Sequence, residues 1–245
     1  MASINTNYGA SIALQNLNKT NAQLEMTQNR VNTGMKVSSA KDSGAIYAIA
    51  TGQRANMGAM ESVRASMQRG QSIVDVALAA GDTVTAALEE MKGLAVSIAG
   101  STGAAQTSYL AEYNALGTEI ASAITGASFD GVNSLTALGS NAAITAVNTG
   151  SITAANATTA NVDAAIAATT STLSTLGTQS KSLGRQISFV NKLQDALEAG
   201  VGNLVDADLA KESAKLTALQ TKQQLGVQAL SIANSSSQTL LGLFR

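Results

Sequence analysis

The chain has 245 residues, with 15 Lys or Arg against 16 Asp or Glu, and it contains no His, Cys or Pro. The balanced charge argues against a nucleic-acid-binding surface, and the missing Cys and His remove thiol nucleophiles, disulfides and the commonest metal ligands. Aromatic residues make up only 3% of the chain, so the core must consist of Leu, Ile, Val, Met and Ala, which suits thin helical layers.

The N-terminal segment has the pattern of an amphipathic helix in heptad register. Its apolar residues recur at intervals of three and four: Leu14, Leu17, Leu24, Val31 and Met35. The polar residues Asn21 and Gln28 fill the remaining positions of the same pattern. A stripe of this kind needs a partner helix to cover it. Thr33-Gly34 and Ser38-Ser39 break the pattern, which predicts a short connector before Ala40.

A long helix is expected next, because apolar residues keep the same spacing from Met60 to Ile98. About 40 residues of helix would extend roughly 60 Å, which exceeds an ordinary globular helix. The cluster Gly100-Ser101-Thr102-Gly103 predicts a turn. A shorter helix carrying Leu110, Tyr113, Ile120 and Ile124 should follow.

The centre of the chain changes character. The Asp130-Gly131 pair between Ser128 and Val132 is typical of a tight turn joining two short strands. Residues 136–160 are rich in Ala, Thr, Asn and Gly, and this composition predicts a small hairpin or irregular loop.

The helical pattern resumes at Val162 and continues to Leu204, after which Asp206 and Asp208 should open a last helix at its positive dipole end. That helix again shows heptad spacing of apolar residues: Leu216, Val227, Leu230 and Leu241. The polar residues Gln223, Asn234 and Ser237 occupy further positions of the same pattern. The simplest cover for each terminal stripe is the other one, so the two ends should pair as a hairpin. Polar residues within the stripes lower stability and fix register, which indicates a coiled coil that is weak alone and becomes ordered among neighbours.

The sequence therefore predicts an all-α fold of long antiparallel helices, with coiled-coil-paired termini and one small β-hairpin or loop region at about 128–160. Catalysis is not expected. Asp206 and Asp208 point to different faces of a helix, as do the neighbours Glu89 and Glu90. Lys41-Asp42 is interpreted as a connector salt bridge and cap, and no glycine-rich phosphate loop is present. We predict a protein that is not an enzyme and has no cofactor.

Several blocks of the sequence resemble bacterial flagellins, in the order that the family shows. At the N-terminal side these are Ser3-Ile4-Asn5-Thr6-Asn7, Arg30-Val31-Asn32-Thr33-Gly34 and Ser39-Ala40-Lys41-Asp42, and in the middle Leu94-Ala95-Val96 and Phe129-Asp130-Gly131-Val132. At the C-terminal side they are Asp206-Ala207-Asp208-Leu209-Ala210-Lys211-Glu212, the Gln-rich segment from Gln220 to Gln228, and Leu240-Leu241-Gly242-Leu243-Phe244-Arg245.

The resemblance implies a subunit that polymerises into the flagellar filament for swimming. Residues 1–45 and 205–245 would form an inner terminal coiled-coil layer, and residues 46–204 an outer helical bundle. The family's outer, variable domains would be missing. A hook–filament junction protein, or another secreted coiled-coil protein, is the alternative, although an Ala-rich chain with a nearly absent centre fits the filament subunit better.

The same resemblance implies an extracellular location in the flagellum, reached through the flagellar type III pathway. The first 20 residues lack the apolar run of a cleaved signal peptide, and no stretch approaches the roughly 18 apolar residues of a membrane span. The expected partners are other copies of the chain, a filament cap, hook–filament junction proteins and an export chaperone. Neither nucleic acid nor a membrane is expected as a partner.

Two further expectations concern the surface. Hydroxyls in or beside the outward loops are candidates for O-glycosylation, as in flagellins of similar brevity: Ser101, Thr102, Thr107, Thr136, Thr145, Thr149, Ser151 and Thr153. Flagellins that mammalian Toll-like receptors detect carry an exposed Arg where the matching block here has Glu90, while Leu94 is retained. We therefore expect poor recognition by that receptor.

Overall fold

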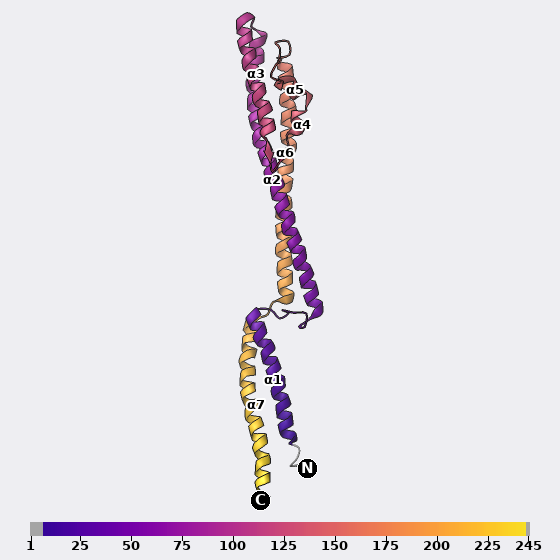
Figure 1. Ribbon diagram of the computed structural model, residues 1–245, viewed down its shortest axis with the longest axis vertical. Helices are drawn as coiled ribbons and strands as arrows, with labels where there is room; N and C mark the ends of the chain where they lie inside the picture. The colour runs from indigo at the N-terminus through magenta and orange to yellow at the C-terminus, as the bar shows by residue number, and fades with distance from the viewer. Residues whose placement is uncertain (1–6, 244–245) are drawn as a thin grey trace. The chain divides into compact units, whose positions relative to one another are not determined.

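The computed structural model describes residues 7–243, and side chains as far as residue 235. The elements in chain order are α1 (Tyr8–Thr33), α2 (Gly44–Ala99), α3 (Gly103–Gly126), β1 (Ser128–Phe129), β2 (Val132–Asn133), α4 (Thr136–Gly139), α5 (Ala142–Asn148), α6 (Thr159–Val205) and α7 (Leu209–Leu243) (Figure 1). The predicted all-α fold with one small two-stranded sheet is confirmed. Within residues 7–243, no helix combines the length and apolarity needed to cross a membrane.

The chain divides into two compact units. One comprises residues 1–58 and 195–245, and the other residues 59–194. The boundaries fall inside α2 and α6, because the ends of these helices pack with the connector that follows α1. Ala50, Val201 and Val205 are buried there. Half-buried Met35 and Met57 pack against this small cluster, so it extends the terminal unit into both long helices.

In the unit of residues 59–194, α2 and α6 run antiparallel. Polar contacts pair low-numbered residues of α2 with high-numbered residues of α6: Arg64 donates to Asn191 (3.5 Å), Ser180 donates to Asp75 (3.4 Å) and Lys92 pairs with Asp163 (2.6 Å). At Gly81 the helices are so close that an added Cβ would lie 2.1 Å from a methyl carbon of Leu173. The core of this unit joins α2 and α6 to Tyr113 and Ile120 of α3.

The predicted hairpin is present, with Phe129 opposite Val132 and Ser128 opposite Asn133. Asp130 and Gly131 both have positive φ (52° and 74°), the backbone conformation of a type I′ turn.

The expected loop over 136–160 is wrong in part, because α4 and α5 occupy residues 136–139 and 142–148. Leu138, Ile144 and Val147 of these short helices are buried in the core. Gly117 of α3 admits them, because the missing side chain lets the Val147 backbone approach α3 closely.

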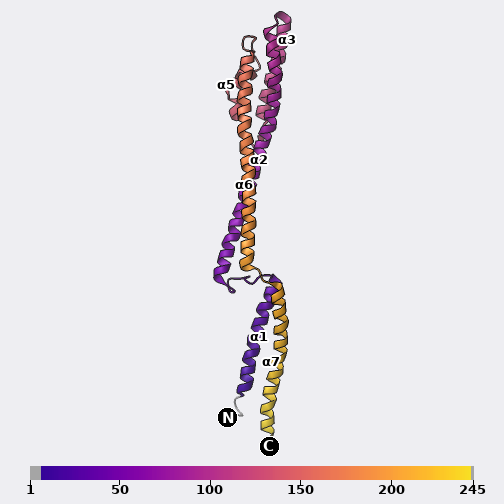
Figure 2. The ribbon, with the colours of Figure 1, turned by 180° about the vertical axis from the view of Figure 1, so that it is seen from behind.

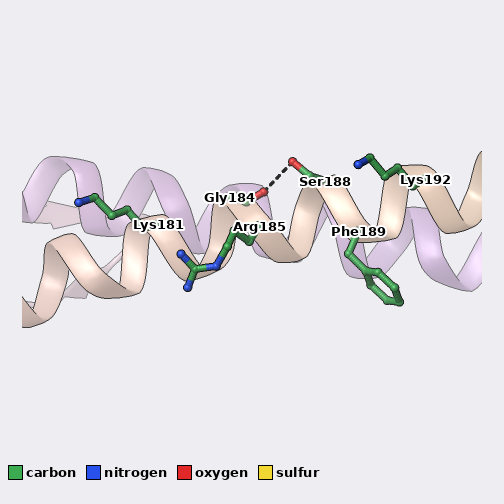
Figure 3. A pocket seen from close by; sticks show the side chains of 6 residues that line it. All are labelled: Lys181, Gly184, Arg185, Ser188, Phe189 and Lys192. Atoms are coloured by element: carbon green, nitrogen blue, oxygen red, sulfur yellow. Dashed lines mark hydrogen bonds between the residues drawn. The ribbon is translucent and has the colours of Figure 1, made fainter.

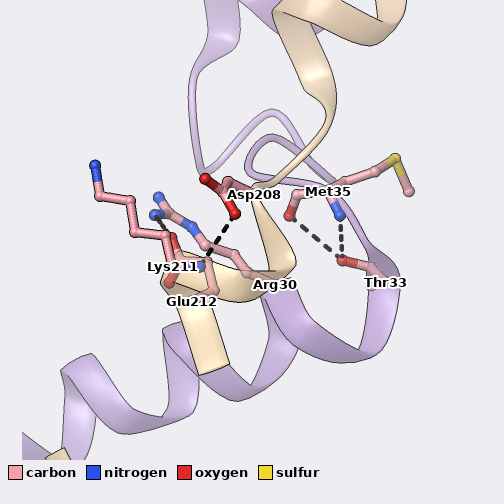
Figure 4. Close-up of polar contacts among 6 residues, drawn as sticks. All are labelled: Arg30, Thr33, Met35, Asp208, Lys211 and Glu212. Atoms are coloured by element: carbon pink, nitrogen blue, oxygen red, sulfur yellow. Dashed lines mark hydrogen bonds and ion pairs between the residues drawn. The ribbon is translucent and has the colours of Figure 1, made fainter. Parts of the chain in front are cut away.

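In the terminal unit, α1 and α7 lie side by side and run antiparallel (Figures 1 and 2). Gly34 has φ 69° and caps α1 at the predicted position. The connector is tied to the segment before α7, because the amides of Lys36 and Val37 donate to Val205 and the amide of Ala207 donates to Gly34. Asp208 accepts a hydrogen bond from the Lys211 amide (3.1 Å), so it opens α7 as expected (Figure 4).

Candidate assembly surface

The seam between α1 and α7 follows a strict 3-4 spacing of buried and half-buried residues. On α1 these are Ala10, Ala13, Leu17, Thr20, Leu24, Thr27 and Val31, and on α7 Glu212, Leu216, Leu219, Gln223, Gly226, Leu230 and Ala233. The expected residues Leu17, Leu24, Val31, Leu216 and Leu230 all lie in this seam. Every second position of the pattern, however, lies one residue earlier in the structure than the sequence predicts. Ala13 takes the place expected for Leu14 on α1, and Gly226 that expected for Val227 on α7.

Leu14 and Val227 lie beside the seam, 49% and 53% exposed. The expectation that Asn21, Gln28 and Asn234 lie within the seam is wrong, since all three are exposed. The positions expected for these residues and for Val227 are taken in the seam by smaller ones, among them buried Thr20 and Thr27 and half-buried Gly226. Such small residues let the two helices approach closely. A Cβ at Gly226 would lie 3.2 Å from a Leu17 methyl carbon.

Asn21 accepts a hydrogen bond from Gln223 (2.9 Å) at the rim of the seam. The side chains of Leu241 and Ser237 lie outside the described residues. Of the polar residues expected in the two stripes, Gln223 therefore lies in the seam, whereas its partner Asn21 is exposed beside it.

The hairpin leaves many large apolar side chains uncovered. The exposed ones are Tyr8, Ile12, Leu14 and Met26 on α1 and Leu209, Leu225, Val227 and Ile232 on α7, and together we call them the apolar flank. These residues lie on both sides of the seam, since helical spacing puts Leu209 and Val227 on one side of α7 and Leu225 and Ile232 on another. Exposed apolar residues mark an interaction surface where they gather into a contiguous patch. Leu225 and Ile232 are seven residues apart, which places them on one side of α7.

An ion pair closes the hairpin at its connector end. Arg30 donates to Glu212 at 3.1 Å, and their side chains are only 27% and 12% exposed (Figure 4). Figure 4 also shows the Thr33 hydroxyl bonded to the backbone of Met35, where the chain leaves α1. These contacts fix the register of the seam.

The polar groups offer no sign of a catalytic centre. Asp42 accepts hydrogen bonds from the backbone amides of Ser39 and Ser38, and these bonds hold the pKa of its carboxyl below the ordinary value. This is the cap expected for the connector, whereas the expected Lys41–Asp42 salt bridge is not formed among the described residues. Burial raises the pKa of Tyr113 to about 12, and its hydroxyl has no hydrogen-bond partner in the described structure. Among the described residues, no three acidic side chains converge as a metal site.

Comparison with known proteins gives the family. Residues 4–140 match the model of the bacterial flagellin N-terminal helical region, and residues 159–244 match that of the bacterial flagellin C-terminal helical region. The chain belongs to the flagellin family. It is 51% identical to flagellin FljN and 49% identical to flagellin FljM of Caulobacter vibrioides, over 99% of this chain and 98% of each relative. A flagellin of Brucella melitensis is 36% identical over the whole of both chains.

This flagellin is therefore a structural subunit of the extracellular flagellar filament, and not an enzyme. The junction-protein alternative is not favoured. The alignment with flagellin C of Rhizobium meliloti covers all of both chains in 321 positions, so that relative carries insertions that the 245 residues here lack. The short form without a variable domain fits this comparison.

The candidate glycosylation hydroxyls of this flagellin fall into two groups. Four are exposed in loops and make no hydrogen bond within the described structure: Thr102, Thr149, Ser151 and Thr153. The others donate to nearby backbone carbonyls: Ser101, Thr107, Thr136 and Thr145. On α2, Glu90 is exposed, whereas Leu94 is half-buried and packs against the core.

Proposed function

We propose that the α1–α7 hairpin is the segment through which this flagellin joins its neighbours in the filament. Residues 1–45 and 205–245 would then form the inner layer, and residues 46–204 the outer one. The observation that carries the proposal is the apolar flank, because one chain alone cannot cover it.

Burial of the flank supplies a driving force of the required size. Burying a fully exposed large apolar side chain contributes about 1.5–3 kcal/mol. The eight residues of the flank are 43–79% exposed, so each can contribute a corresponding part of that gain. Part of this gain offsets the entropy lost when the subunit is immobilised. The seam itself is thin, since it includes Thr20, Thr27, Gly226 and Ala233. The hairpin is therefore a segment whose stability depends on its neighbours.

Export in an unfolded state through the flagellar type III pathway completes the proposal. A chain without Cys forms no disulfide, and a chain without Pro avoids slow X-Pro isomerisation on refolding. An export chaperone would cover the apolar residues of the hairpin before export. The filament cap and the hook–filament junction proteins would contact them at the two ends of the filament.

The test removes the last 30 or so residues, which deletes α7 from about Leu216 onward. The core of the unit formed by residues 59–194 draws on no residue of α7, so this unit should keep its helical signal. We expect a folded monomer that forms no filament in electron micrographs, whereas the full chain forms long uniform tubes. A truncated chain that still grows filaments, or that loses all helical signal, would contradict the proposal.

A point variant separates loss of the flank from loss of the helix. Val227→Asp places a charge on the apolar flank, and Gln228→Asp places the same charge on the neighbouring exposed position. Only the first change should abolish assembly. Equal effects of the two would show that charge on α7, and not the flank, is responsible.

We also propose that O-linked sugars are carried by the loop hydroxyls Thr102, Thr149, Ser151 and Thr153, where the structure leaves room and an unbonded hydroxyl. The intact mass of protein from native filaments tests this directly. A mass that agrees with the bare 24.7 kDa chain would end the idea.

A further inference from the structure

The outer face of α6 carries a row of cations that have no partner among the described residues. Lys181, Arg185 and Lys192 are exposed, and Ser188 lies between the last two. The spacing i, i+4, i+7, i+11 puts these four residues on one side of the helix. Figure 3 shows them around a shallow hollow that also includes Phe189, whose ring is 64% exposed. We call this set the basic stripe.

None of these cations forms an ion pair or hydrogen bond within residues 59–194, all of which the structure describes. The other cations of that unit are all paired: Arg64 with Glu61, Arg69 with Asp130 and Lys92 with Asp163. The surplus positive charge is thus confined to one stretch of α6.

A row of matching spacing and opposite charge lies on α3. Glu112 and Glu119 are exposed, without an ion pair, and seven residues apart, as Arg185 and Lys192 are. Ser108 and Ala115 share their face and complete the same i, i+4, i+7, i+11 pattern. We call these four residues the acidic stripe. Because α3 contains no Lys or Arg, nothing along that helix neutralises it.

The two stripes are complementary in register as well as in charge. Two helices with the same rise per residue present charges seven residues apart at equal distances, about 10.5 Å. Arg185 and Lys192 can therefore meet both glutamates at once. Ser188 and Ala115, the residues at the middle of each row, are small enough for the helices to approach, and the Phe189 ring lies beside this contact.

The acids of α2 fit less well, although Asp82 and Glu89 have the same spacing. Lys92 follows Glu89 by three residues and is therefore its neighbour on the helix surface, so a positive charge lies beside the acidic pair. Asp75, the preceding acid in the row, accepts a hydrogen bond from Ser180 of its own α6. This leaves α3 as the better match.

We propose that the basic stripe of α6 docks on the acidic stripe of α3 in a second copy of the chain. The two surfaces differ, so the contact is heterologous: each subunit offers one stripe to each of two neighbours. Heterologous contacts that do not close into a ring generate open helical polymers, which is the form of a filament. The inference rests on polymerisation of this flagellin, and not on the role proposed for the terminal hairpin.

The test reverses each stripe separately and then both together in the full chain. Arg185→Glu with Lys192→Glu, and Glu112→Lys with Glu119→Lys, should each raise the critical concentration for growth on sheared filament seeds about tenfold, because attraction becomes repulsion. The four changes together should restore it to within about twofold of the unaltered protein. The proposal would be overturned if either pair of reversals left assembly unchanged. It would also be overturned if the variant with all four substitutions assembled as poorly as the two double variants.

A matched control distinguishes α3 from α2. Combining the α6 reversals with Asp82→Lys and Glu89→Lys adds the same charges at the same spacing, and should not rescue assembly. Rescue by this variant would place the acceptor on α2 and overturn the assignment to α3. All the altered side chains are exposed, so the monomers should keep the helical signal and thermal midpoint of the unaltered chain.

Discussion

Replacing Gly117 by Ala tests how the central helices are held on α3. A Cβ at this position would lie 2.6 Å from the Val147 carbonyl oxygen and 3.2 Å from the Asn148 Cα. Both are backbone atoms, so the clash cannot be relieved by turning a side chain. The segment that follows α5 is also clamped, because Asn114 donates to the Ile152 carbonyl (3.2 Å) and accepts from its amide (2.7 Å).

The expected magnitude follows from opposing terms. Ala in place of Gly within a helix contributes up to about 1 kcal/mol of stability. Overpacking of this kind costs about 1–3 kcal/mol, and loosening the Asn114 hydrogen bonds costs about 1 kcal/mol more for each bond lost. We expect a net loss of about 2 kcal/mol.

The matched control is Gly93→Ala on α2, where no atom lies within 4 Å of the added Cβ. That change should stabilise the monomer by about 0.5–1 kcal/mol. Thermal unfolding of both variants, followed by helical circular dichroism, should shift the midpoints in opposite directions, down by roughly 6 °C for Gly117→Ala. A Gly117→Ala protein as stable as the Gly93→Ala protein would refute the close approach of α5 to α3.

Tyr113→Phe should stabilise the monomer by about 1 kcal/mol, because it removes a buried hydroxyl without a partner. Since burial raises the pKa of Tyr113 to about 12, the unaltered chain should lose stability relative to this variant as pH rises from 10 to 12, which urea unfolding at several pH values measures. Arg30→Ala should lower the free energy of unfolding by about 1–3 kcal/mol, because it leaves the poorly exposed carboxylate of Glu212 without its partner. Arg69→Ala should lower it by less than about 1 kcal/mol, because the side chains of that ion pair are about 60% exposed. Equal losses of the two variants in urea unfolding would contradict this. Monomeric protein should signal weakly in a Toll-like-receptor reporter assay and Glu90→Arg should raise the signal, so strong signalling by the unaltered chain would reject the prediction.

The terminal helices show what heptad spacing can and cannot predict. Leu17, Leu24, Leu216 and Leu230 are common to the predicted and the observed seam, because they fit the 3-4 pattern in either choice of alternate position. Leu14 is more apolar than Ala13, and for this reason the sequence favoured the wrong alternate residue. In an isolated coiled coil that choice would be sound. Here the larger residue is left on the exposed flank, as expected for a helix with further partners beyond its own chain.

The central segment was predicted least well, for a different reason. Residues 136–148 contain only three large apolar side chains, Leu138, Ile144 and Val147, and three are too few to establish a helical period. The buried residues Leu138, Ile144 and Val147 gain their cover from α3, and Gly117 lets α5 approach α3 closely, as Gly139 of α4 does beside Ile124. A tertiary contact of this kind leaves no local signal in the composition. The stripes on α3 and α6 are likewise invisible until the structure shows which charges already have partners.

The most direct test of the central claim measures the apolar flank before and after assembly. Because the chain has no Cys, Val227→Cys introduces a single thiol, and Ser151→Cys serves as a loop control. The account predicts that the thiol at 227 reacts readily with a maleimide in the monomer and at least about tenfold more slowly in the filament, while the thiol at 151 reacts equally in both. Equal reactivity at position 227 in monomer and filament would show that the flank stays exposed, and would contradict the claim that the terminal hairpin joins the subunits.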